Sequence, residues 1–276
     1  MRCFNCGAEL DMPYTFCDIC DMPQPEDGVL QEEGPLLEGD SPPPPDEDDL
    51  PLFMHNQGDP IITSPDEPHL ACIVLIDTSD LIAGYTIGNL NKALQRLIAK
   101  VRMDEMASRR VDIAVVGFDS SAYVIADFMP VAEISEPYSF SAGGGTAMGA
   151  GIDLAIDMLY DRCEVYDSLG TPAYRPWILM VSNSTPSDDV DYAAERVRYA
   201  ESSPGTGSLR FFALGAGYYD KASLLKITNR VMELTDADFE RFFSWVGEGL
   251  IEVSASPVGD EPKLGDLPAN ARVVAS

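Results

Sequence analysis

The stretch Ala71-Cys-Ile-Val-Leu-Ile-Asp77-Thr-Ser79-Asp80-Leu81 decides the fold of this chain. Residues 71–76 are all apolar, as expected for a β-strand that is buried on both faces of a parallel sheet. Asp77, Ser79 and Asp80 then form a short oxygen-rich loop at the carboxyl end of that strand. Ligands bind at the carboxyl ends of the strands in open α/β sheets, so this loop is the first candidate for a functional site.

Strands and helices alternate beyond this stretch. Further apolar strands are expected at 111–118, 123–128, 177–181, 210–214 and 231–234, the first two joined as a hairpin by Asp119-Ser-Ser121. Helices are expected around 87–101 and 152–159, and at 188–201, 220–227 and 236–250. This alternation predicts an α/β fold with a doubly wound, mostly parallel sheet and one antiparallel edge strand.

A glycine-rich segment, Ser141-Ala-Gly-Gly-Gly-Thr146-Ala-Met-Gly-Ala-Gly151, opens the helix after the hairpin. It lacks the Lys of a phosphate-binding P-loop, so nucleotide binding is not expected there. Its glycines allow the backbone of Thr146 to approach a site closely. The oxygens of Asp77, Ser79 and Thr146 are of the kind that Mg²⁺ or Mn²⁺ prefers.

These segments carry a family resemblance, together with Arg175-Pro-Trp-Ile-Leu-Met-Val-Ser-Asn-Ser-Thr-Pro-Ser-Asp188 and Phe239-Glu-Arg-Phe-Phe-Ser-Trp-Val246. Over roughly residues 69–253 the chain resembles a von Willebrand factor A (vWA) domain. Within that group it is similar to TerY-like proteins of bacterial tellurium-resistance and stress-response clusters. The resemblance implies a metal-ion-dependent adhesion site with the pattern Asp-x-Ser-x-Ser.

Two positions depart from that family pattern. Leu81 stands at the last Ser position of Asp-x-Ser-x-Ser, and Asn183 replaces the Asp of a later Thr-Asp-Gly. The site has therefore lost one hydroxyl and one carboxylate, so Mg²⁺ or Mn²⁺ should bind weakly unless Asp80 or Asp119 substitutes. Two interpretations fit: a weakened metal site, or an Asp77 and a Ser79 that only cap backbone groups at a strand end.

Two Cys-x-x-Cys pairs near the N-terminus predict a zinc site. The spacing is typical of tetrathiolate Zn²⁺ coordination. So short a segment also has too small a hydrophobic core to fold without a bound metal ion or a covalent cross-link. A redox pair or a disulfide framework is the alternative. The expected ligands are Cys3, Cys6, Cys17 and Cys20.

Composition divides the chain into a zinc-knuckle module (1–22), an acidic Pro-rich linker (23–68), the vWA-like domain (69–255) and a C-terminal tail (256–276) that either pairs with the sheet or stays loose. Residues 21–68 contain 11 Pro and 14 Asp plus Glu, with no Lys or Arg. Such a segment is expected to be a solvated spacer. Alternatively, the apolar residues 50–54 anchor it on a partner or over the vWA-like domain.

Charge and hydropathy exclude several classes of function. The net charge of −28 argues against nucleic acid and against an anionic membrane surface as partners. Neither a signal peptide nor an apolar run of membrane-spanning length is visible. We therefore expect a cytoplasmic protein.

The function predicted from these features is a non-enzymatic adaptor that binds a protein partner through the metal-site face. Asp80, Asn183 and Tyr218 are candidate contacts, although Tyr218 equally suits a packing role in its loop. The TerY-like resemblance implies kinase- or phosphatase-like partners in a bacterial stress-response or phage-defence complex. The alternatives are a metal-dependent hydrolase that uses Asp77, and an acidic inhibitor that mimics nucleic acid. A Ser-His-Asp triad is not expected, because both histidines lie in or beside the linker.

Overall fold

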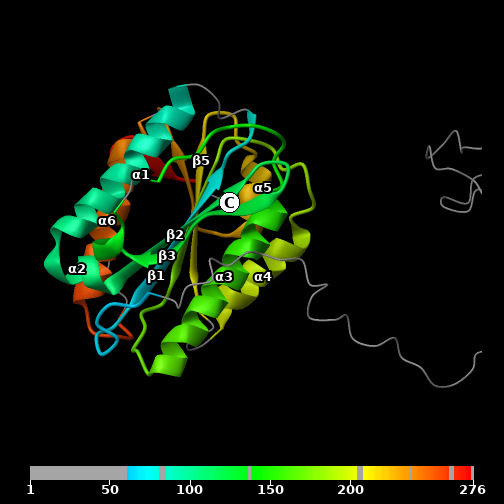
Figure 1. Cartoon of the computed structure of the whole chain (residues 1–276). Coiled ribbons are helices and arrows are strands. Elements are labelled where there is room, and N and C mark those ends of the chain that lie inside the picture. Colours follow the sequence, from blue (N-terminus) through cyan, green and yellow to red (C-terminus); the bar gives the residue numbers. More distant parts are fainter. Residues whose placement is uncertain are drawn as a thin grey trace, which may run out of the picture. The chain divides into compact units, whose positions relative to one another are not determined.

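The structure is a computed structural model, and it describes residues 61–80, 85–135, 138–203, 208–236, 238–260 and 264–274 (Figure 1). The four predicted zinc ligands, most of the predicted linker and Leu81 lie outside the described residues. None of the described helices combines the length and the apolar character needed to cross a membrane.

A seven-stranded sheet forms the centre of the described domain. Its strands are β1 (Leu70–Asp77), β2 (Val111–Phe118), β3 (Ala122–Pro130), β4 (Trp177–Ser182), β5 (Arg210–Ala216), β6 (Val231–Leu234) and β7 (Ala271–Val273). The spatial order is β3-β2-β1-β4-β5-β6-β7, with antiparallel pairing only for β3 on β2 and β7 on β6. The doubly wound, mostly parallel sheet is confirmed, and the C-terminal tail adds a second antiparallel edge strand.

Helices cover both faces of this sheet. One face carries α1 (Tyr85–Met103), α2 (Glu105–Arg110) and α6 (Phe239–Ala255), and the other carries α3 (Met148–Leu169), α4 (Asp191–Ser202) and α5 (Lys221–Ile227) (Figure 1). Helices α4 and α6 begin three residues later than the sequence predicted. The reason is that the aspartates at those predicted starts lie before the helix: Asp188 accepts hydrogen bonds from amides at the start of α3, and Asp236 accepts one from the Asp238 amide just before α6.

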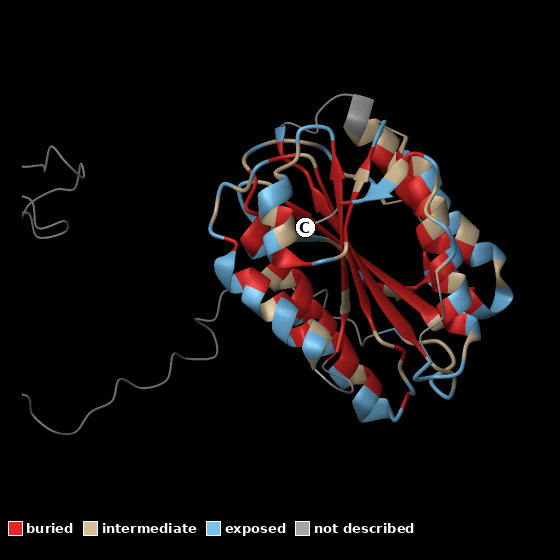
Figure 2. Cartoon of the chain, turned by 180° about the vertical axis from the view of Figure 1, so that it is seen from behind, coloured by how far each residue is buried: buried red, intermediate tan, exposed pale blue. Residues whose placement is uncertain are grey.

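Strand β1 contributes side chains to the hydrophobic cores on both faces of the sheet. All of its residues are buried (Figure 2). Alternate side chains belong to opposite core clusters: Leu70, Cys72, Val74 and Ile76 lie on the α1 and α6 side, and Ala71, Ile73 and Leu75 on the α3 side. This two-sided burial accounts for the continuous apolar run in the sequence.

A buried polar cluster lies at the amino ends of β1 and β2. Asp112 Oδ2 accepts hydrogen bonds from Arg162 at 2.7 Å and from the Tyr166 hydroxyl, and it lies 3.1 Å from His69 Nδ1. These four side chains are at most 4% exposed. Arg162 also donates to the carbonyl oxygen of Ile61 at 2.8 Å, so the cluster ties the end of the predicted linker to the sheet.

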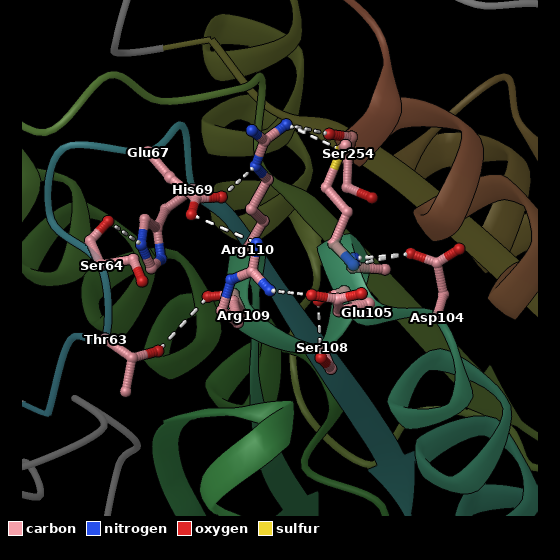
Figure 3. A network of polar contacts seen from close by, with 12 residues as sticks. Thr63, Ser64, Glu67, His69, Asp104, Glu105, Ser108, Arg109, Arg110 and Ser254 are labelled. Atoms are coloured by element: carbon pink, nitrogen blue, oxygen red, sulfur yellow. Dashed lines mark hydrogen bonds and ion pairs between the residues drawn. The ribbon is translucent and has the colours of Figure 1, made fainter.

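A second network of polar contacts lies beside His69 of this cluster (Figure 3). Glu67 pairs with Arg110 at 2.8 Å and with Arg109 at 3.3 Å. Arg110 also donates to the carbonyl oxygen of Ser254 at the end of α6, at 2.9 Å. Residues 61–69 therefore pack as part of the domain, at the edge of the sheet opposite to Asp77.

The buried cluster predicts a graded loss of stability. Arg162→Met should lower the free energy of unfolding by about 3–5 kcal/mol, because Asp112 would remain as a buried charge without its partner. Tyr166→Phe removes one donor and should cost about 1–3 kcal/mol. Urea unfolding measures both, and Arg198→Ala, at an exposed position, should stay within about 0.5 kcal/mol of the parent. A change for Arg162→Met as small as that of the control would contradict this account.

Candidate functional site

Loops from four strands meet at the carboxyl edge of the sheet. The glycine loop (residues 143–147) bonds to the loop after β1, because the Gly143 amide donates to the Thr78 carbonyl at 2.8 Å and the Asp80 amide donates to the Gly144 carbonyl at 3.2 Å. The Ala147 amide donates to the Asp119 carbonyl at 2.5 Å. These backbone bonds bring together segments that are far apart in the sequence.

Asp77 is fully buried at the end of β1. Its Oδ1 accepts a hydrogen bond from the Ser79 amide at 3.0 Å. Its Oδ2 accepts from the Ser182 hydroxyl at 2.7 Å and from the Asn183 amide at 3.4 Å. Both carboxylate oxygens are therefore satisfied by donors of the protein itself.

A short chain of hydroxyl groups continues from Asp77. Ser79 is 1% exposed, and its hydroxyl lies 2.8 Å from that of Ser184. Ser184 in turn donates to Asn183 Oδ1 at 3.0 Å. Ser182 and Ser184 were not predicted as site residues, although they flank Asn183, where the vWA resemblance implies a carboxylate.

Thr146 lies in the glycine loop with its backbone fixed by the loop that follows β4. Its amide donates to Ser187 Oγ at 3.1 Å, and its carbonyl accepts from the Ser187 amide at 2.8 Å. Thr146 is 5% exposed. The structure thus brings Thr146 to the same edge as Asp77 and Ser79.

The N-terminus of α3 is filled by a carboxylate of the chain itself. Asp188 accepts from the amides of Gly149 at 3.1 Å and Ala150 at 3.0 Å. A β-carbon at Gly149 would lie 2.5 Å from the carbonyl oxygen of Asp189, so only glycine permits this approach. Because helix N-termini are common anion sites, this occupancy supports the prediction that the glycine loop holds no phosphate.

Two predicted partner contacts are open to solvent. Asp80 is exposed, and its carboxylate has no partner among the described residues. Tyr218 is 96% exposed and therefore has no packing role within its loop. Its neighbour Tyr219 packs against Gly215 and donates to Glu233, and burial together with this bond raises the pKa of Tyr219 to about 12. Asn183 is half-buried at the same edge.

As arranged, these residues do not fit a divalent cation. Mg²⁺ needs near-ideal octahedral coordination by oxygen, whereas Asp77 already serves three donors and Ser79 is engaged with Ser184. Among the described residues, no group of three or more His, Cys, Asp or Glu side chains lies close enough to hold a metal ion. The predicted weak Mg²⁺ or Mn²⁺ site stays a prediction.

Comparison with known proteins identifies solved structures that share the fold of this chain. No family model and no curated protein matches the sequence. The pilus adhesin SpaC from Lactobacillus rhamnosus GG matches with a TM-score of 0.52 and 11% identity, over 67% of this chain and 31% of that one. Proximal thread matrix protein 1 from the mussel byssus matches with a TM-score of 0.50 and 15% identity, over 68% and 46%.

A von Willebrand factor type A structure from Catenulispora acidiphila also matches, with a TM-score of 0.47 and 16% identity over 67% of this chain and 43% of that one. The chain spans less than half the length of these three proteins. Such likeness concerns the fold alone, a mostly parallel sheet with helices on both faces. The TerY-like resemblance stays a prediction.

Completing the metal-site pattern that the vWA resemblance implies should create a metal site. The variant Leu81→Ser, Asn183→Asp gains one hydroxyl and one carboxylate, and the added charge beside Asp77 should lower its melting temperature without metal. Mg²⁺ or Mn²⁺ should then raise that temperature, because ligands that bind only the native state stabilise it. We expect no rise for the parent in the same thermal melts. An equal rise in the parent would show that its site is already competent.

Proposed function

We propose that this chain is a non-enzymatic protein-interaction module that binds its partner without a metal ion. The binding surface would be the carboxyl-edge face, formed by Asp80, Asn183, Tyr218 and the glycine loop. The observation that carries this proposal is the set of backbone and hydroxyl bonds that joins these loops directly to one another. Loops fixed in advance lose less entropy when they bind.

A hydrolase is less well supported than an interaction module. His69 lies at the amino end of β1 and is fully buried, whereas Asp77 ends the same strand. At about 3.3 Å per residue, the eight-residue strand separates them by about 25 Å. No described histidine therefore stands near enough to Asp77 to act as its base.

The kind of partner and the cellular setting are proposed from the sequence resemblance to TerY-like proteins. That resemblance implies kinase- or phosphatase-like partners in a bacterial stress-response or phage-defence complex in the cytoplasm. The zinc module would supply a second contact, and tethering it to the same chain would raise the overall affinity. SpaC is itself a pilus adhesin, and an interaction role for this chain is compatible with the fold that the two share.

The exposed side chain of Tyr218 allows a test of whether the carboxyl-edge face binds the partner. Tagged full-length protein should capture a stoichiometric partner from cells that encode it, and Tyr218→Ala should reduce that capture severalfold, because exposed tyrosines are frequent energetic anchors of interfaces. Tyr199→Ala is the matched control, since Tyr199 is 73% exposed on α4, away from the face. Equal loss in both variants, or in neither, would argue against this face as the binding surface.

Cysteine reactivity tests the zinc module. Burial raises the pKa of Cys72 to about 12 and that of Cys163 to about 11, so neither thiol should be alkylated at pH 8 in the folded protein. A chelator should expose four further thiols and release one Zn²⁺ per chain. Mass spectrometry counts the modified cysteines, and unfolding should expose all six. Four reactive thiols before chelation would contradict the zinc prediction.

A further inference from the structure

Strand β3 forms one side of the sheet, where β2 is its only described neighbour. Among the described residues, no backbone group outside β2 bonds to the backbone of residues 122–129. In an antiparallel pair, alternate residues of a strand turn their N–H and C=O groups away from the neighbouring strand. The outer side of β3, which faces away from β2, therefore presents a row of donors and acceptors to which a further strand can bond.

The part of this outer side that can accept a strand is short. The register with β2 shifts at Ile125 and again at Asp127 and Phe128, as in β-bulges. At the second shift the Phe128 amide donates to Asp127 Oδ1 at 2.7 Å, so one donor of the strand is satisfied within the strand itself. Bulges twist an edge strand and limit how far another chain can follow it. Pairing is therefore expected over residues 122–126.

Residues 122–126 are apolar but not buried. Their sequence is Ala-Tyr-Val-Ile-Ala, and every one of them is exposed or half-buried, with Val124 41% exposed. The neighbouring strand β2 is, by contrast, buried throughout. A further strand laid beside β3 would remove these apolar side chains from water, and such burial favours association.

The two edge strands of the sheet differ in their protection against such pairing. Proteins protect edge strands by making them very short and by placing charged residues or Pro on them. Strand β7 has only three residues, and its Arg272 pairs with Glu233. Residues 122–126 of β3 contain neither a charged residue nor Pro. Strand β3 is therefore the less protected of the two.

The charge of the chain favours another protein over a second copy as the source of the added strand. Two copies, each with a net charge of −28, repel each other at close approach. Asp127 is exposed at one end of residues 122–126, and Asp119 lies just before them in the sequence. An extended segment without acidic residues meets no such repulsion.

We propose that the outer side of β3 binds an extended, apolar segment of a partner protein, which adds a further strand to the sheet over residues 122–126. Backbone hydrogen bonds supply the affinity in this mode of recognition, and side chains that contact Val124 and its neighbours supply the specificity. The segment carries no net negative charge. This inference adds a second binding surface and does not depend on the carboxyl-edge face.

The test is an NMR titration of ¹⁵N-labelled full-length protein with two capped peptides of equal charge, Lys-Val-Thr-Val-Thr-Lys and Lys-Val-Pro-Val-Pro-Lys. Pro has no N–H group and disfavours β pairing. The first peptide should shift the amide signals of Tyr123, Val124 and Ile125 in a saturable way, and the second should not. Equal shifts with both peptides would mean charge attraction alone and would overturn the inference, as would the absence of shifts with either.

A pair of valine variants tests the position of the bound strand. Val124→Lys places a charge on β3 and should weaken binding of the first peptide severalfold, because a charged edge strand opposes pairing. Val273→Lys is the matched control, since Val273 is 65% exposed on β7 at the other side of the sheet, and it should leave binding unchanged. Equal weakening in both variants would contradict β3 as the binding strand.

Sedimentation of the protein without peptide tests the second copy as an occupant. We expect a monomer over the concentration range of the titration. A dimer that Val124→Lys dissociates and Val273→Lys does not would overturn the inference, in favour of pairing between the β3 strands of two copies.

Discussion

A carboxylate buried at the end of the central strand is the constraint on which the site depends. Strand β1 is covered on both faces, so Asp77 has no access to water and must find its donors in the protein. Those donors come from the next turn of the same loop and from the end of β4, through Ser79, Ser182 and Asn183. Satisfying one buried charge thus fixes two neighbouring strand ends against each other.

The sequence predicted most of the fold because its strands are buried on both faces, and such burial leaves continuous apolar runs such as residues 71–76. It predicted the start of α6 poorly, because an Asp that caps a helix and one inside its first turn look alike in a pattern. Strand β7 has only three residues, two of them exposed, and leaves almost no pattern. The site residues Ser182 and Ser184 were not predicted for another reason. The hydrogen-bond partners of a hydroxyl group are residues close in space, and a sequence pattern does not show which residues those are.

The carboxyl and amino edges of the sheet differ in charge because the helices that connect the strands are polar. Helices start at the carboxyl edge, where their free amides favour Asp, and they end at the amino edge, where their free carbonyls favour Arg. Asp220 caps α5 at one edge, and Arg110 donates to the end of α6 at the other. Much of the acidity of the carboxyl edge is therefore structural.

An amide at Asn183, where the vWA resemblance implies a carboxylate, would change more than the affinity for a cation. A bound Mg²⁺ would present positive charge to a partner, whereas hydroxyl groups can hold the same loops without presenting any. Under the proposed function, a carboxyl-edge face whose loops are joined by hydroxyl groups would recognise its partner through loop shape and hydrogen bonds.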